Sequence, residues 1–299
     1  MQTWGRGNRD IQNITLNFRH KTSKMILRRK ILPRNVSDAL VTLFTLVIIP
    51  IVYYFELFVV LPHYYSQWSA GYTFHFVTGT FILFNVCSNY VAIVVCDTSI
   101  YGRLLPTILG PNSRFCAVCE CIAPPRSWHC PTCNVCILKR DHHCMFTSCC
   151  VGHHNLRYFI SFVFYIFIST VYASYYNLFF AFEFAEFGSW ESIIKLIFPL
   201  ASLFVSYSRH QMYLFIVLIV LIGGVFTGVL LYYHCDLILR GVVTHDRQQK
   251  LSPYDYGRKN NIIEALGERW YLVWVSPFLE SKLPRDGVNW DVKQSLKAK

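Results

Sequence analysis

The sequence predicts an all-α membrane protein, with four helices that cross a bilayer and a small cysteine-rich domain between the second and third helices. Three observations support this fold class. Of the 299 residues, 54% are hydrophobic and only 15% are charged, whereas a soluble domain carries about 25% charge. Four apolar runs are each long enough to cross a hydrocarbon core of about 30 Å at 1.5 Å per residue. Nine of the twelve cysteines lie in one short polar stretch, residues 116–155.

The first two apolar runs are separated by only ten residues. The first, 39–61, contains Glu56 as its single charged residue and follows a polar N-terminal segment, in which we find no apolar core of a cleavable signal peptide. The second, 72–96, contains His75 as its only ionisable side chain apart from tyrosine and cysteine. An ionisable group inside a span is a functional hypothesis by default, which makes Glu56 and His75 candidates. Glu56 is near the end of its span, however, where its side chain can reach the membrane interface.

The other two long apolar runs, 158–182 and 213–235, follow the cysteine-rich stretch. Two shorter apolar segments do not reach the length of a span. Ile193–Val205 is interrupted by a lysine and a proline, and Trp270–Leu279 covers only ten residues. Segments of this length favour an interfacial or re-entrant position for the first and an interfacial position for the second.

The distribution of basic residues predicts the orientation of the four spans. Segments 1–38, 97–157 and 236–299 contain nine, six and eleven lysines and arginines, while 62–71 has none and 183–212 has two. Loops rich in lysine and arginine remain in the cytosol, so we expect both termini and the cysteine-rich domain to face the cytosol. Because membrane topology explains the net charge of +11, we expect no nucleic-acid partner.

A transporter or channel is not favoured, because the spans lack the intramembrane charges that such pathways need.

The predicted topology divides the chain into five parts. The predicted parts are the basic N-terminus 1–38, the first two spans within 39–96, the cysteine-rich domain 97–157, the last two spans within 158–235 with a lumenal loop 183–212, and the cytosolic tail 236–299.

The cysteine-rich stretch has the composition of a metal-binding domain. Cytosolic thiols stay reduced, so clustered cysteines there indicate metal binding or catalysis instead of disulfides. Cys-x2-Cys pairs place two thiolates around one ion, and Zn²⁺ takes four such ligands tetrahedrally. Cys116/Cys119 and Cys130/Cys133 are the nuclei of two sites, which would use eight of the fourteen cysteines and histidines in the stretch. Spacing alone does not assign the remaining ligands or the spare thiol.

The motif Asp141-His142-His143-Cys144 carries a resemblance to a known family. The stretch resembles the DHHC cysteine-rich domain of integral-membrane protein S-acyltransferases, or palmitoyltransferases, a family with four spans and this domain between the second and third. The match continues without a gap through Pro124-Pro125-Arg126, His129 to Cys136, and Cys150-Val151-Gly152 with Asn155.

The resemblance implies a role for each residue of the site. Cys144 would be the nucleophile, His142 would take its proton, and Asp141 would orient His142. Thr244 would hydrogen-bond to Asp141, and Asn261 would support the fold. The two structural zinc ions would each have three cysteines and one histidine, namely Cys116, Cys119, His129 and Cys136 for one ion and Cys130, Cys133, His143 and Cys150 for the other.

The resemblance also implies a substrate class. A long-chain acyl-CoA, such as palmitoyl-CoA, would acylate Cys144, and the acyl group would pass to a cysteine of a cytosolic or membrane-anchored substrate protein. The acyl chain would lie among the helices, with candidate wall residues Phe146, Phe159 and Phe162. Cationic candidates for the CoA phosphates are Arg126, Lys139 and Arg140. The family usually resides in the endoplasmic reticulum or Golgi membrane, which we expect here.

Two pairs of residues after Cys144 depart from the family pattern. Met145-Phe146 replaces the usual Pro-Trp, which relaxes the backbone beside Cys144. Ser148-Cys149 replaces Asn-Asn and adds a thiol. These departures leave an alternative open, namely a catalytically weak or inactive zinc-binding membrane scaffold of the same fold.

Overall fold

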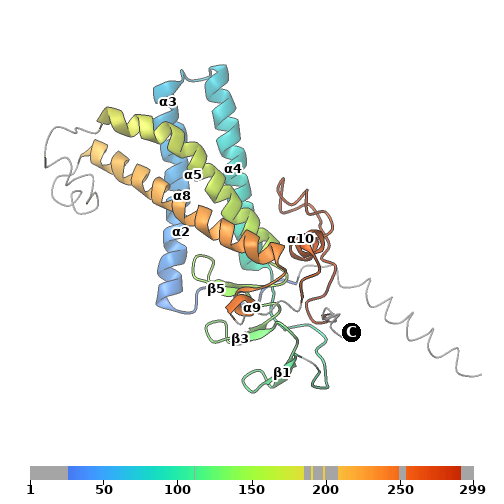
Figure 1. Ribbon diagram of the computed structural model, residues 1–299. Helices are drawn as coiled ribbons and strands as arrows, with labels where there is room; N and C mark the ends of the chain where they lie inside the picture. The colour runs from blue at the N-terminus through green and yellow to red at the C-terminus, as the bar shows by residue number, and fades with distance from the viewer. Residues whose placement is uncertain are drawn as a thin grey trace, which may run out of the picture.

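The computed structural model describes residues 26–110, 112–184, 190, 198, 208–248 and 254–290. Four long helices form one end of the molecule, and three short hairpins are stacked beyond their base (Figure 1). The fold is therefore mostly helical, with the cysteine-rich region between the second and third long helices.

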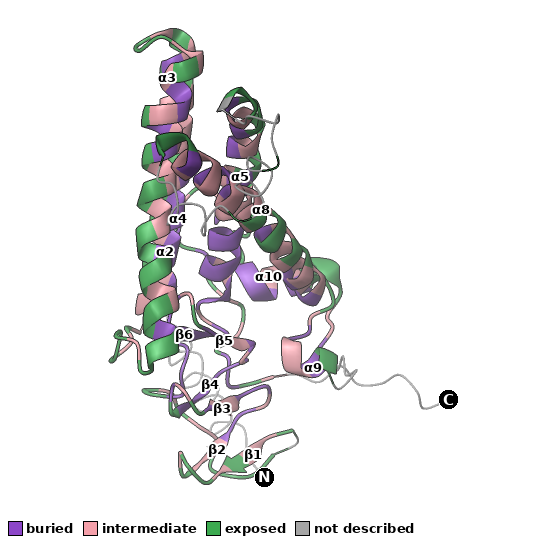
Figure 2. Ribbon diagram, turned by 90° about the vertical axis from the view of Figure 1, so that its left-hand side faces the viewer, coloured by how far each residue is buried: buried purple, intermediate pink, exposed green. Residues whose placement is uncertain are grey.

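Among the residues that the structure describes, four helices are long and apolar enough to cross a membrane, in agreement with the predicted number of spans. The first is built from α2 (Val36–Phe55), the π-helical turn η1 (Glu56–Val60) and α3 (Leu61–Tyr64). The other three are α4 (Ala70–Val95), α5 (Leu156–Phe184) and α8 (Arg209–Leu239). They extend up to four residues beyond the predicted runs. Much of the outer face of α2 is exposed (Figure 2), as expected for a surface that contacts lipid.

Polar caps fix where three of these helices begin. The side chains of Asn35, Ser69 and Ser208 accept hydrogen bonds from backbone N–H groups three residues further on. Each cap satisfies one of the N–H groups that a first helical turn leaves without a partner. α5 packs between α4 and α8, and the core at its base includes Cys144, Phe159 and Phe162.

The cysteine-rich region consists of hairpins, so the all-α prediction is wrong for this part of the chain. Three antiparallel pairs follow one another: β1 (Arg114–Cys116) with β2 (Cys121–Ala123), β3 (Trp128–Cys130) with β4 (Val135–Ile137), and β5 (His142–Cys144) with β6 (Cys149–Val151). Strands of three residues are too short to show a period-2 pattern in the sequence.

The three hairpins are copies of one 14-residue unit. Each first strand ends at a cysteine, Cys116, Cys130 or Cys144, which pairs with the residue five positions later. Each turn contains a residue in the left-handed region at the same position, namely Glu120, Asn134 and Ser148, with φ of 50°, 50° and 48°. The unit therefore repeats in backbone conformation as well as in sequence spacing.

The segment after the last span returns to the hairpins. α9 (Thr244–Gln248) and α10 (Arg258–Leu266) lie near the base of the long helices (Figure 1). The guanidinium of Arg126 connects the two regions, since it donates to the carbonyl of Gly241 and to Asp246, each at 2.9 Å.

Of the two short apolar segments, the structure describes one and leaves most of the other outside the described residues. Trp270–Leu279 forms a series of turns with exposed large side chains, including Tyr271, Val275 and Phe278, as an interfacial segment would require. Ile193–Val205 lies outside the described residues except for Phe198, so its predicted interfacial position stays a prediction.

Candidate functional site

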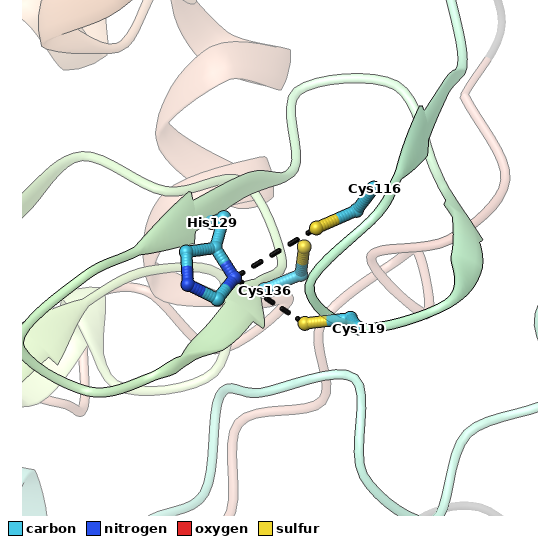
Figure 3. Close-up of side chains that lie close together, drawn as sticks. All are labelled: Cys116, Cys119, His129 and Cys136. Atoms are coloured by element: carbon cyan, nitrogen blue, oxygen red, sulfur yellow. Dashed lines mark hydrogen bonds between the residues drawn. The ribbon is translucent and has the colours of Figure 1, made fainter.

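The first and second hairpins together form one cluster of potential metal ligands. Cys116 and Cys119 come from the first hairpin, and His129 and Cys136 come from the second (Figure 3). Nδ1 of His129 lies 3.8 Å from Sγ of Cys116 and 3.3 Å from Sγ of Cys119. All four potential ligand atoms lie within 4.8 Å of one another. We call this cluster the first metal site.

The second and third hairpins form an equivalent cluster, the second metal site. Its members are Cys130, Cys133, His143 and Cys150. Nδ1 of His143 lies 3.6 Å from Sγ of Cys130, 3.4 Å from Sγ of Cys133 and 3.7 Å from Sγ of Cys150. The 14-residue repeat explains the likeness, because in each site the Cys-x2-Cys pair of one hairpin meets a histidine and a cysteine from the strands of the next hairpin.

Both clusters fit Zn²⁺ by donor type and by spacing. Ligands of a tetrahedral zinc ion at about 2.3 Å for sulfur and 2.0 Å for nitrogen are about 3.5–3.8 Å apart. The measured separations of 3.3–3.8 Å are close to this range. With three thiolates and one imidazole, each site is complete without water, the composition of a structural zinc centre.

The third hairpin repeats the turn of a metal site, but its turn residues lie outside the two clusters. Cys144 takes the position of Cys130, and Thr147 takes the position of Cys133, in the 14-residue repeat. In the second hairpin the backbone N–H of Cys133 donates to Sγ of Cys130 at 3.3 Å. Cys144 similarly accepts from the backbone and side chain of Thr147. The Cys144 thiol therefore accepts the same type of backbone hydrogen bond as Cys130 in the second metal site.

His142 and Asp141 lie beside this thiol. Nδ1 of His142 is 2.7 Å from Oδ2 of Asp141, and His142 also hydrogen-bonds to Cys144. The other carboxylate oxygen of Asp141 accepts from the backbone N–H of Thr244 at 3.0 Å and from its hydroxyl at 3.1 Å. The carboxylate is buried, since Asp141 is 8% exposed, whereas the His142 side chain is 28% exposed.

The pKa values of these three groups favour a charged pair. Burial raises the pKa of Asp141, but the hydrogen bond and charge of His142 lower it to about 2. Burial lowers the pKa of His142, but its bonds to Asp141 and Cys144 raise it to about 9. Burial also raises the pKa of Cys144, yet the interaction with His142 leaves it below its ordinary value. A thiolate next to an imidazolium is a reactive nucleophile.

A cavity of about 470 Å³ begins at this thiol and extends among the long helices. Cys144 and His142 line one end, and Glu56 and His75 line another part of its wall. The lining is almost entirely apolar, and it includes the three predicted wall residues Phe146, Phe159 and Phe162. The structure thus brings these residues together around one space that is suited to an aliphatic chain.

The two intramembrane candidates hydrogen-bond to α5. Asn177 donates to Oε1 of Glu56 at 2.8 Å. His75 interacts with the hydroxyl groups of Tyr172 and Tyr176. These polar contacts join helices that lipid would otherwise separate.

The predicted CoA-binding residues lie in less accessible positions than expected. The side chain of Arg126 is 1% exposed and is paired with Asp246. Lys139 is 6% exposed, and burial lowers its pKa to about 7. Arg140 is partly buried beside the thiol groups of Cys130 and Cys150. A role in CoA binding stays a prediction for these residues, and the burial of Arg126 and Lys139 does not favour it.

The predicted supporting residue Asn261 joins α8 to the tail. Its side-chain amide donates to the carbonyl of Leu239 at 3.0 Å and to Asp255 at 2.7 Å, and its oxygen accepts from the N–H of Tyr256 at 2.9 Å. These bonds tie the end of α8 to α10 and to the two residues Asp255 and Tyr256 shortly before it.

Two functional neighbours were missed in the sequence. His234 of α8 is buried, with Nδ1 3.7 Å from Oδ2 of Asp141. Asp38 of α2 is 2% exposed, and its Oδ2 lies 2.9 Å from Nε2 of His143. Neither had a local signal. His234 lies near the end of the last predicted apolar run, and Asp38 is 105 positions from its partner.

Comparison with known proteins gives a consistent result. The family model described as DHHC palmitoyltransferase matches residues 110–251. The chain is 36% identical over 239 residues to the probable palmitoyltransferase ZDHHC24 of Danio rerio, covering 78% of this chain and 81% of that protein. It is also 36% identical over 216 residues to the protein of the same name from Mus musculus, covering 69% of this chain and 74% of the relative.

Proposed function

This chain belongs to the DHHC palmitoyltransferase family, and we propose that it is a protein S-acyltransferase with Cys144 as its nucleophile. The donor would be a long-chain acyl-CoA such as palmitoyl-CoA. The acceptor would be a cysteine of a cytosolic or membrane-anchored protein. The observation that carries this proposal is the position of Cys144, whose thiol lies beside His142 and lines the apolar cavity.

The reaction has two balanced steps. The thiolate of Cys144 attacks the thioester carbonyl, the bond from that carbon to the CoA sulfur breaks, and the CoA thiolate takes a proton from the His142 imidazolium. The acceptor thiol then returns a proton to His142 and attacks the acyl-Cys144 thioester. Cys144 leaves as a thiolate, so the pair is restored. Asp141 stabilises the imidazolium in both steps and keeps the ring in one orientation.

The cavity supports a long-chain donor by its length. Thr42 donates to the carbonyl of Met145 at 3.1 Å, which places that turn of α2 beside the nucleophile. Glu56, which also lines the cavity, is fourteen residues further along the same helix. At 1.5 Å per residue the two positions are about 21 Å apart, which is long enough for a fatty acyl chain.

The two metal sites would serve as scaffold. Zinc would be held by Cys116, Cys119, His129 and Cys136 in the first site and by Cys130, Cys133, His143 and Cys150 in the second. Bound zinc would supply folding free energy to hairpins that have few apolar residues of their own. Both sites would leave Cys144 free.

The proposed orientation places the hairpins in the cytosol. The distribution of 26 basic residues on one side and two on the other supports it. Cytosolic CoA and substrate proteins would then meet Cys144 at the membrane surface, in the endoplasmic reticulum or Golgi. Protease protection of sealed microsomes tests the orientation, since the region around the hairpins should be cleaved without detergent.

Acyl-enzyme formation tests the activity. Purified protein is incubated with fluorescent palmitoyl-CoA, and the adduct is challenged with hydroxylamine. The wild type should carry a hydroxylamine-sensitive label and Cys144→Ala should carry none. Cys149→Ala is the matched control, because Cys149 is the cross-strand partner of Cys144 and is also buried, and it should retain the label.

One observation favours the alternative of a weak or inactive scaffold. Met145, which stands where the family usually has proline, is 47% exposed directly beside the nucleophile. If the wild type carries no adduct while both metal sites contain zinc, the proposal of an enzyme is wrong and the scaffold function is supported. If Cys144→Ala and the wild type label equally, the nucleophile assignment is wrong.

A further inference from the structure

A buried carboxylate from the first long helix contacts the second metal site. Asp38 lies in the first turn of α2, where Asn35 caps the helix by accepting from the backbone N–H of Asp38 at 2.7 Å. The side chain of Asp38 is 3% exposed, and its Oδ2 is 2.9 Å from Nε2 of His143. The cap holds the backbone of Asp38 at the start of the helix, and its carboxylate lies against the imidazole of His143.

The two nitrogens of His143 have different partners. Nδ1 faces the three thiols of the second metal site, and Nε2 faces Asp38. With a metal ion on Nδ1, the proton of the neutral ring is on Nε2, where it can be donated to the carboxylate. Such a carboxylate fixes the orientation of a metal-binding imidazole, and its removal typically costs 10–100-fold in metal affinity.

The same face of α2 makes a second contact with the third hairpin. Thr42 follows Asp38 by four residues, so both side chains lie on one face of the helix. Thr42 donates to the carbonyl of Met145, two residues beyond His143. Both sequence neighbours of Cys144, His143 and Met145, are therefore held by hydrogen bonds with α2.

We propose that Asp38 is a positioning residue of the second metal site, through which the first turn of α2 holds the hairpin that carries Cys144. The inference rests on the zinc assignment of the proposed function. Loss of the Asp38 contact should loosen the zinc bound by His143 and misplace the neighbouring thiol, while the first metal site, formed by the first two hairpins, should be unaffected.

Zinc release from the purified full-length protein tests this inference. A metallochromic dye follows release of the metal to excess chelator, and the wild type should lose two zinc ions per chain. In Asp38→Asn we expect one of the two ions to leave about 10–100-fold faster and the other to leave at the wild-type rate. The Cys119→Ala background removes the first site, so that the acceleration should appear in the single remaining ion.

Three further variants separate the carboxylate contact from other effects. Ser37→Asp/Asp38→Asn returns an acidic residue to the first turn of α2, from an exposed position, without restoring the contact with His143. It should release zinc as fast as Asp38→Asn. Asp97→Asn changes another buried carboxylate, which accepts from the N–H of Ser99, and should leave release unchanged. Thr42→Val should slow acyl-enzyme formation but leave zinc release unchanged.

The outcomes distinguish this inference from the proposed function. If the wild type holds two zinc ions and Asp38→Asn releases both at the wild-type rate, the role of Asp38 is disproved and the enzyme proposal stands. If Thr42→Val accelerates zinc release as much as Asp38→Asn does, a general displacement of α2 explains the faster release, and the specific contact between Asp38 and His143 does not. If the wild-type protein does not contain two zinc ions, the assignment of the two metal sites is wrong. In an active enzyme, Asp38→Asn should lower kcat for acylation more than it changes KM.

Discussion

The hydroxyl of Thr244 donates to Oδ1 of Asp141 at 3.1 Å, although 103 positions of chain separate the two residues. The backbone N–H of Thr244 donates to the same oxygen. This contact leaves Oδ2 of Asp141 directed at His142, so a residue beyond the last span orients the proposed proton acceptor.

Thr244→Val should slow acyl-enzyme formation about tenfold. The substitution removes one hydrogen bond to a charged group, worth roughly 1.5 kcal/mol, while the backbone donor remains. The initial rate of fluorescent labelling measures the effect. Thr78→Val is the control, since its hydroxyl bonds only to Phe74 of its own helix turn; an equal loss in both variants would contradict a specific role for Thr244.

The acylation rate should fall as the pH rises above about 9, where His142 loses the proton that stabilises the Cys144 thiolate. The pKa of Cys144 is lowered, so its thiolate is present above that lowered pKa, and the pKa of His142 is raised to about 9, so its imidazolium persists below that value. Asp141→Asn removes the partner that raises the pKa of His142. The thiol pKa should then return toward about 8.5, and the labelling rate should rise with pH below that value. A pH-independent rate in Asp141→Asn would contradict the ion-pair account.

Arg126→Ala should destabilise the protein by about 3–5 kcal/mol, because it leaves the Asp246 carboxylate buried without its cation. Thermal unfolding in detergent should show a lower Tm. The double variant Arg126→Ala/Asp246→Ala should lose less than the sum of the two single variants. Additive losses would show that the ion pair does not join the hairpins to α9.

Lys139 should make the protein less stable at low pH. Burial lowers its folded-state pKa to about 7 from 10.5, so the unfolded state binds more protons between these values and stability rises with pH across this window. The penalty, on the order of a few kcal/mol, is fully present below pH 7 and absent above 10.5. Lys139→Met should raise Tm at neutral pH and flatten this pH dependence. A higher KM for acyl-CoA in this variant, with unchanged pH dependence of Tm, would instead support the predicted CoA contact.

The two metal sites should differ in their effect on catalysis. Cys133→Ala disrupts the site that contains His143, the neighbour of Cys144, whereas Cys119→Ala disrupts the more distant first site. Each variant should lose one of two zinc ions, measured by elemental analysis. Labelling should fall more in Cys133→Ala. Equal losses would mean that the hairpins unfold as one unit.

Sequence alone predicted the features that depend on composition and spacing. Four spans follow from long apolar runs, and the family resemblance implied the two sets of four ligand residues that the hairpins bring together. The 14-residue spacing of Cys116, Cys130 and Cys144 is also present in the sequence, and it would have predicted three equivalent hairpins. The three-residue strands themselves give no periodic signal.

Features that depend on long-range packing could not be predicted in this way. Asp38 and His234 reach the site only because α2 and α8 are placed beside the third hairpin. Arg126 and Lys139 were expected at the surface because basic residues usually are exposed. Their burial depends on the C-terminal tail, whose Trp290 ring lies 4.9 Å from the Arg126 guanidinium and 5.5 Å from the Lys139 ammonium.

The position of Thr244 in the chain also sets the order in which the site can be completed during synthesis. At about 5–20 residues per second, the ribosome needs roughly 5–20 s to proceed from Asp141 to Thr244. For most of that interval, once Cys150 has been added, the nascent chain contains Cys144, His142 and all eight potential metal ligands, but the donor that orients Asp141 does not yet exist. The newborn protein therefore passes through a stage in which its proposed nucleophile exists but its proposed proton acceptor is not yet aligned, and this stage ends only after the fourth helix has been synthesised.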